Sequence, residues 1–101
     1  MTSTTTSRGA ERPILAFFCS EVSGRCRRTE SFLAQVLQRR GNHDTFRFYR
    51  IPVETRPDLH ERLGVEEVPT LAVIENKRMS SRLVKPRGCS DIQRFLAPWM
   101  R

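Results

Sequence analysis

Hydrophobic residues in this chain fall into short continuous runs that alternate with stretches of helical spacing. Four segments have the short apolar runs that predict strands, namely residues 13–19, 46–53, 68–74 and 79–84. The first run is apolar on both of its faces, which is typical of a central strand covered by helices on each side. Asn76 and Lys77 predict the tight turn of a hairpin between the last two strands.

Three stretches show the spacing of an amphipathic helix instead, namely residues 25–40, 55–63 and 91–99. Ser23 is expected to cap the first helix, because its hydroxyl can accept from a free amide of the first turn. Cys26 lies seven residues before Leu33 and therefore begins the stripe of that helix that faces the core. Gly64 is expected to end the second helix, and Ser90 is expected to cap the third.

The order of these elements is β-α-β-α-β-β-α, which predicts an α/β fold. A strand–helix–strand start implies a parallel pair joined by a right-handed crossover, and the terminal hairpin adds an antiparallel edge. We therefore expect a four-stranded mixed sheet with helices on both faces. The 101 residues suit one domain. It is expected over residues 13–101, after a polar tail over residues 1–12 that is expected to be disordered.

The chain is basic, with 18 Lys and Arg residues against 11 Asp and Glu residues and a formal net charge of +7. Such a charge can indicate a nucleic-acid or acidic partner, although arginines on solvated faces give the same total. The segment Phe-Arg-Phe-Tyr-Arg at residues 46–50 could stack on bases. We expect it to pack in the core instead, because the fold places a buried central strand there. A nucleic-acid partner is therefore the least favoured of three functional hypotheses.

The cysteines and histidines of the chain argue against metal and disulfide chemistry. Cys19, Cys26 and Cys89 are too few for a disulfide framework, and no pair of them has zinc-ligand spacing. We therefore expect no metal site and no cofactor. No apolar run is long enough to span a membrane, and the N-terminal residues lack the apolar segment of a secretory signal. A cytoplasmic location with free thiols is expected.

Two motifs lie in elements that match those of a known family. Residues 23–26, Ser-Gly-Arg-Cys, follow the first strand and open a helix, and residues 68–70, Val-Pro-Thr, open the third strand. Together they resemble motifs of the thioredoxin superfamily, and the resemblance extends over residues 13–99 and implies a thioredoxin-like core. By this resemblance Ser23 stands at the place of the first cysteine of a Cys-x-x-Cys pair, and Cys26 at the place of the second.

The chain departs from the family pattern at several other positions. By the same resemblance, Phe17 replaces the buried acid of the first strand that serves thioredoxins as a proton shuttle. Cys19 replaces a tryptophan, and Arg50 replaces a lysine of the second strand. Residues 1–12 are expected to leave no room for the extra strand and helix that precede the core in full thioredoxins.

Dithiol exchange needs an attacking thiolate and a second thiol that resolves the mixed disulfide. Ser23 has no accessible anion near neutral pH and forms no disulfide, so dithiol oxidoreductase activity is not expected. Two redox alternatives stay open. Cys26 can act as a monothiol if the helix N-terminus favours its thiolate more than burial opposes it. It can also pair with Cys19 if their Cα atoms lie within about 7 Å. Cys89 is expected to be an ordinary loop cysteine.

The motif can also serve binding without redox chemistry. The resemblance implies that Pro69 is a cis-proline beside Ser23 and Cys26, where the neighbouring backbone can pair with an extended peptide. The residues expected in such a peptide-binding groove are Gly24, Arg25, Val68, Pro69 and Thr70. The two main hypotheses are therefore a protein that acts at most as a monothiol through Cys26, and a redox-inactive binding module for a protein or peptide partner.

Overall fold

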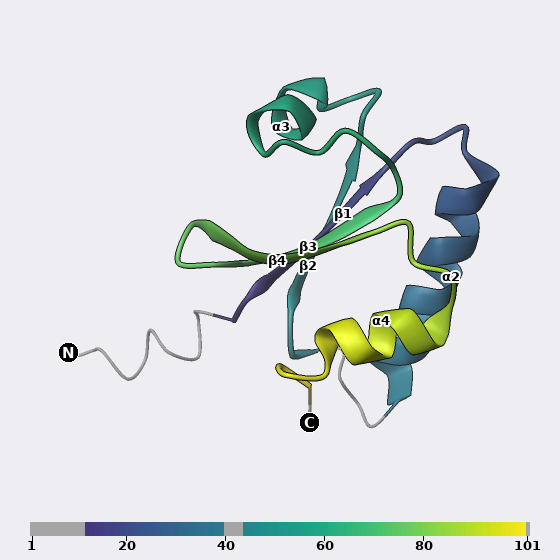
Figure 1. Ribbon diagram of the computed structural model, residues 1–101, viewed down its shortest axis with the longest axis vertical. Helices are drawn as coiled ribbons and strands as arrows, with labels where there is room; N and C mark the ends of the chain where they lie inside the picture. Colours follow the sequence, from purple (N-terminus) through teal and green to yellow (C-terminus); the bar gives the residue numbers. More distant parts are fainter. Residues whose placement is uncertain (1–11, 40–43, 101) are drawn as a thin grey trace.

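One sheet and three helices make up the part of the chain that the computed structural model describes, residues 12–39 and 44–100 (Figure 1). The strands are β1 (Ile14–Cys19), β2 (Arg47–Pro52), β3 (Thr70–Glu75) and β4 (Arg78–Val84). The helices are α2 (Gly24–Gln38), α3 (Pro57–Arg62) and α4 (Cys89–Leu96). The predicted order β-α-β-α-β-β-α is confirmed.

The four strands form one mixed sheet in the order β2-β1-β3-β4. β1 and β2 run parallel, with Ile14 opposite Arg47, because a helical crossover joins them. β1 and β3 are antiparallel, as are β3 and β4. Asn76 and Lys77 have φ angles of 52° and 67°, which suit the tight turn predicted between β3 and β4. The predicted α/β fold with a four-stranded mixed sheet is therefore confirmed.

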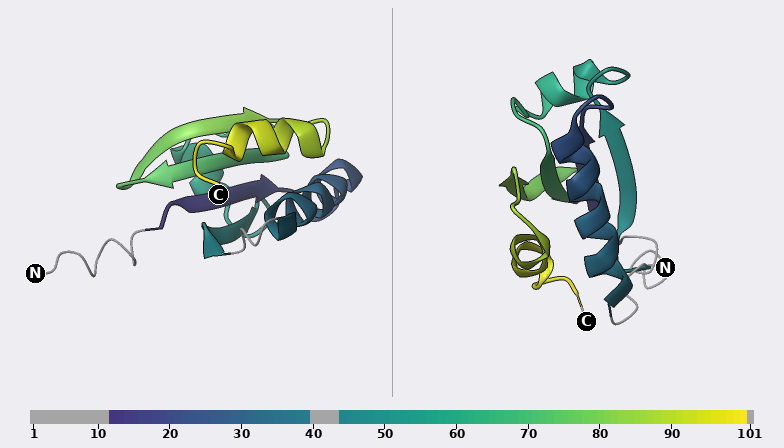
Figure 2. Two further views of the ribbon diagram at one scale, coloured as in Figure 1. Left: turned by 90° about the horizontal axis from the view of Figure 1, so that it is seen from below. Right: turned by 90° about the vertical axis from the view of Figure 1, so that its right-hand side faces the viewer.

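Side chains of β1 alternate between two apolar layers, one on each face of the sheet. Leu15, Phe17 and Cys19 belong to the larger cluster, which includes residues of α2 and α4. Ala16 and Phe18 belong to the smaller cluster on the other face, and all five residues are fully buried. Figure 1 shows α2 and α4 together and apart from α3, and Figure 2 shows α4 beside α2. The prediction that β1 is a central strand with helices on both sides is confirmed.

α2 begins directly after its predicted cap, one residue earlier than expected. The Ser23 hydroxyl accepts the Cys26 N–H at 3.2 Å and so satisfies one of the free amides of the first turn. The buried residues of the helix recur at intervals of three and four, as an inward stripe requires, and are Cys26, Thr29, Leu33 and Val36. The predicted end of this helix at residue 40 lies outside the described residues.

The ends of α3 and α4 differ in how well the sequence predicted them. Gly64 follows α3 with a φ of +71°, a conformation that glycine adopts without a side-chain clash, so its role as a helix stop is confirmed. The prediction that Ser90 caps the last helix is wrong, because α4 begins at Cys89, two residues earlier than expected, and its N-cap is Gly88. The Asp91 carboxylate instead accepts the Arg87 N–H at 3.0 Å and orders the chain before the helix.

β2 is an edge strand of the described sheet, and the prediction of a buried central strand there is wrong. Among the described residues, β2 pairs only with β1. Phe48 and Tyr49 are 42% and 45% exposed, although the Phe48 ring stacks on Phe17 with centroids 6.4 Å apart. The core packing expected for residues 46–50 therefore holds fully only for Phe46, which is buried.

The predicted N-terminal tail, residues 1–12, lies outside the described residues except for Arg12. The Arg12 guanidinium donates to the Asp44 carbonyl at 3.0 Å. The Pro13 carbonyl accepts the Arg47 N–H at 2.9 Å, so the described chain joins the sheet at this residue. No helix within the described ranges is long and apolar enough to cross a membrane.

Candidate functional site

The turn between β1 and α2 carries the Ser-x-x-Cys motif. Val22 projects from this turn and is 88% exposed. The half-buried Ser23 uses its hydroxyl to cap α2, and Gly24 and Arg25 open the helix at the surface. Cys26 alone among the four motif residues faces the core. The Ser23 hydroxyl and the Arg25 guanidinium therefore lie at the surface beside the Val22 side chain, whereas the Cys26 thiol does not.

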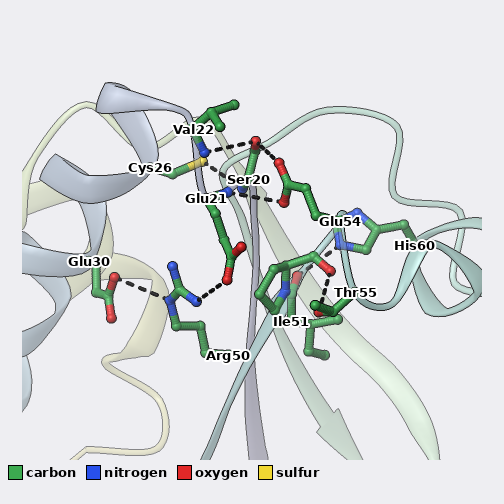
Figure 3. Close-up of polar contacts among 11 residues, drawn as sticks. Ser20, Glu21, Val22, Cys26, Glu30, Arg50, Ile51, Glu54, Thr55 and His60 are labelled. Carbon is green, nitrogen blue, oxygen red and sulfur yellow. Dashed lines mark hydrogen bonds and ion pairs between the residues drawn. The ribbon is translucent and has the colours of Figure 1, made fainter.

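The Cys26 thiol is buried and hydrogen-bonded. Its side chain is 3% exposed and lies in the larger apolar cluster. The sulfur accepts the Ser20 N–H at 3.4 Å, across the turn that leads into α2 (Figure 3). A disulfide substrate must bring its own sulfur into contact with the attacking one, and this burial prevents such contact.

Cys19, the second cysteine of interest, ends β1 and is fully buried. Burial raises the pKa of its thiol to about 11, and the Arg50 guanidinium offsets that effect only in part. Cys19 and Cys26 belong to the same apolar cluster, and both are free thiols. Because the thiolate is the reactive form, a thiol with this pKa is a poor nucleophile near neutral pH.

Cys89 is the most accessible of the three cysteines, and it lies in a helix and not in a loop as predicted. It is the first residue of α4 and is only partly buried. Its thiol donates to the Gln35 side-chain oxygen at 3.4 Å and lies 3.8 Å from the Phe32 carbonyl. These contacts join α4 to α2.

The segment before β3 contains a cis peptide bond between Val68 and Pro69. The Pro69 carbonyl accepts the Lys85 N–H at 2.7 Å, and the Thr70 hydroxyl donates to the Glu67 carbonyl at 2.6 Å. Neither the N–H nor the carbonyl of Val68 bonds to another described residue. Val68 therefore has a backbone donor and an acceptor of the kind that an extended peptide pairs with.

A pocket joins the first turns of α2 to the segment after β4, and we call it the basic pocket. Its volume is about 460 Å³. Four of its seven lining residues are basic, and the seven are Arg25, Arg28, Thr29, Phe32, Lys85, Pro86 and Arg87. Because the Lys85 N–H bonds to the Pro69 carbonyl, the pocket adjoins the segment before β3.

The predicted site residues do not all reach the surface. Arg25 lines the basic pocket, whereas Pro69 is buried and is joined to the lining only by the bond from the Lys85 N–H to its carbonyl. Thr70 is 1% exposed and its hydroxyl is already bonded, so its side chain is directed into the fold. Cys26 is likewise inside the fold. The surface near the motif is therefore formed by Val22, Ser23, Gly24 and Arg25, without the Cys26 thiol.

A polar network beneath the turn was not predicted from the sequence (Figure 3). Glu54 follows β2 and accepts from the Ser20 hydroxyl and from the Glu21 N–H. These bonds, the one from Ser20 above all, lower the pKa of Glu54. Arg50 on β2 pairs with Glu21 and Glu30 on either side. The network depends on the parallel pairing of β1 and β2, which brings the carboxyl ends of both strands together.

The buried histidine of α3 contacts residues of the strands β1 and β2. His60 is 5% exposed, and its Nε2 lies 2.9 Å from the Ile51 carbonyl. Its ring packs against the Phe18 ring in a T-shaped arrangement, with centroids 5.0 Å apart. Across residues 12–39 and 44–100, no group of three or more His, Cys, Asp or Glu side chains is placed to hold a metal ion.

A match to a family model shows which family the chain belongs to. The model described as Thioredoxin matches residues 4–98, which is most of the chain. The chain belongs to the thioredoxin family. The resemblance inferred from the two motifs is thereby confirmed at the level of the family. The sequence finds no match among curated protein sequences.

Solved thioredoxin structures share the fold of this thioredoxin-family chain. Trxlp from Edwardsiella tarda superposes with a TM-score of 0.76 at 16% identity, over 100% of this chain and 96% of that chain. Thioredoxin from Fasciola hepatica gives 0.75 at 14% identity, over 94% and 88%. The germline-specific thioredoxin Deadhead from Drosophila melanogaster gives 0.73 at 19% identity, over 93% and 87%. At these identities the similarity shows a common fold and leaves the activity to be argued from the site.

Proposed function

We propose that this thioredoxin-family protein is a redox-inactive binding module that recognises an extended segment of a protein partner. One observation carries the proposal: the motif has no thiol at the surface. Ser23 has a hydroxyl where the family pattern has an attacking sulfur, and Cys26 is 3% exposed. The surface around the motif stays available to a partner.

Dithiol exchange requires two sulfur atoms that act in turn. The first, as a thiolate, attacks the substrate disulfide and releases one substrate sulfur, and the second then displaces the other substrate sulfur as the protein disulfide forms. Ser23 can take neither role. Phe17 is fully buried where the family resemblance implies a proton-shuttling acid, so it can exchange no proton with the site. Both changes oppose turnover of a disulfide substrate.

Two surface features support peptide binding. Val22 is a branched apolar side chain with 88% exposure, and a partner that covers it would remove that area from water. Val68 supplies a free backbone N–H and carbonyl beside the cis peptide bond. Main-chain bonds to an added strand provide affinity that does not depend on a reactive thiol.

A monothiol role through Cys26 is the second candidate function. It is supported by the position of Cys26 in the first turn of α2, where free amides attract an anion. A disulfide with Cys19, which lies in the same cluster, is a separate redox alternative for Cys26. The two candidate functions differ in whether a reagent reaches the Cys26 sulfur in the folded protein.

Alkylation of the native protein separates the two candidates. With excess iodoacetamide near neutral pH, we expect mass spectrometry to show early labelling of Cys89 and protection of Cys19 and Cys26 until denaturant is added. Cys26→Ser is the matched control, and its native labelling should equal that of the unchanged protein. Fast labelling of Cys26 in the folded protein would support the monothiol function and contradict the binding module.

A further inference from the structure

Positive charge gathers around the basic pocket with few carboxylates to balance it, namely Glu67 beside Lys85 and Asp91, whose pKa the hydrogen bond from the Arg87 N–H and the nearby arginine charges lower. The guanidinium groups of Arg25, Arg28 and Arg87 make no ion pair with a carboxylate among the described residues. Of the four basic residues that line the pocket, Lys85 alone makes an ion pair with a described carboxylate, that of Glu67 at 3.7 Å. Cations that surround one cavity repel one another, so an anion placed among them would be attracted by all of them.

The geometry of these cations suits a carboxylate group. Arg25 and Arg28 are three residues apart on α2, and residues with that spacing lie about 5–6 Å apart on one face of a helix. Arg87 lines the same cavity from the segment after β4, where the Asp91 carboxylate fixes its backbone N–H at 3.0 Å. A planar guanidinium binds a carboxylate through two parallel hydrogen bonds. The cavity, at about 460 Å³, has room for an acidic side chain.

We propose that the basic pocket binds an Asp or Glu side chain of the partner peptide. This inference rests on the proposed function and adds the chemistry of the partner, an extended segment with an acidic residue near the part that pairs with Val68. Lys85 connects the two regions, because it lines the pocket and its N–H bonds to the Pro69 carbonyl. A peptide that pairs with the backbone before β3 therefore runs next to the pocket.

A single-stranded nucleic acid fits this site less well than an acidic peptide does. Such a strand is bound by exposed aromatic rings along a track of cations. Phe32, the aromatic residue of the pocket, is partly buried against the core. The exposed Phe48 and Tyr49 lie on β2, at the opposite edge of the sheet from β4. These rings therefore lie apart from the cations of the basic pocket, and the cation beside them is Arg47, whose guanidinium lies 5.9 Å from the centre of the Tyr49 ring.

Selection from a random peptide library tests the proposal. The full chain is immobilised, displayed peptides are selected on it, and the selected sequences are then measured as free fluorescent peptides. We expect an Asp or Glu at a constant position among them. Its replacement by Asn or Gln should raise the dissociation constant about tenfold, because a charge-assisted contact is lost. Added salt should weaken the binding of the acidic peptides.

Two variants with the same net charge show whether the pocket is responsible. The pocket variant replaces its three unpaired arginines and carries Arg25→Gln, Arg28→Gln and Arg87→Gln. The control variant replaces three exposed arginines outside the pocket and carries Arg27→Gln, Arg62→Gln and Arg78→Gln. We expect the pocket variant to bind the acidic peptide about tenfold more weakly than the control variant. Circular dichroism confirms that both are folded.

Four results would overturn the inference, and they differ in what they say of the proposed function. If no peptide is selected, the proposed function and the inference both fail. If peptides are selected without an acidic residue, or if both variants bind them equally, only the inference fails. If a single-stranded oligonucleotide binds more tightly than the peptides and loses binding in the pocket variant, the pocket is a nucleic-acid site and the inference is wrong.

Discussion

Ser23 has a structural task at the position where the family pattern has a reactive cysteine. Its hydroxyl accepts the Cys26 N–H at the start of α2, a cap that contributes about 1 kcal/mol to the stability of a protein. The hydroxyl oxygen of Ser23 accepts this hydrogen bond well, but it cannot form a disulfide. Under the proposed function, the residue keeps the start of the helix intact and supplies no sulfur for exchange.

Ser23→Cys is expected to restore part of the missing chemistry. The new thiol would lie at the N-terminus of α2, three residues before Cys26, and a slow turnover of a disulfide substrate should appear. It should stay slow because Phe17, and no acid, is buried in β1. Ser23→Ala is the control, and it should lose about 1 kcal/mol of unfolding free energy without gaining activity. No turnover in Ser23→Cys would show that the surrounding residues have reshaped the site.

Cys19 should make the stability of the protein depend on alkaline pH. Its thiol has a pKa of about 11 in the fold and an ordinary value of 9.0. Between these values the unfolded chain has lost the proton and the folded chain keeps it. The unfolding free energy should thus be unaffected below pH 9 and fall by about 2–3 kcal/mol as pH rises to 11. Urea unfolding measures this fall, which Cys19→Ala should lack, and equal slopes in both proteins would contradict it.

At the scale of secondary structure, the parallel strands β1 and β2 position the polar groups of the site. β1 and β2 end side by side, which brings Glu54 to the Ser20 hydroxyl across 34 residues of sequence. The same pairing leaves β2 at the edge of the described sheet, with Phe48 half-exposed. A run of aromatic residues indicates a strand but not its place in the sheet, because edge and central strands both bury at least one face. The sequence therefore predicted the strand correctly and its burial wrongly.

The end of α3 provides a test at the same scale. Gly64 has a φ of +71°, so a side chain there would be strained even though no atom lies within 4 Å of the added Cβ. Gly64→Ala should therefore lower the unfolding free energy by about 1 kcal/mol. Gly24→Ala is the matched control, because its Cβ also meets open space but its backbone is helical. That variant should be neutral or more stable by up to about 1 kcal/mol. Denaturant unfolding compares the two, and equal losses would contradict the assignment.

At the scale of the whole molecule, the positions of the charged residues are more informative than the net charge. The net charge of +7 can be read from the composition, and it suggests an anionic partner of unknown kind. The structure brings Arg25 and Arg28 together with Lys85 and Arg87 around one cavity. Nearly 60 residues separate these two groups in the chain. The burial that argued against a nucleic-acid surface over residues 46–50 is not observed, but the exposed rings of Phe48 and Tyr49 lie at the other edge of the sheet and are not part of this cavity.

The sequence by itself determined the order of the elements and the cap at Ser23, which follow from periodicity and from the chemistry of single residues and need no knowledge of distant contacts. Its resemblance to the thioredoxin superfamily implied that Ser23 stands where the attacking sulfur would be. Only the tertiary structure decided that Cys26 is shielded, that β2 lies at the edge and that four cations share a pocket. Each of these three features depends on which distant segments of the chain pack together, and a local sequence pattern does not predict such contacts.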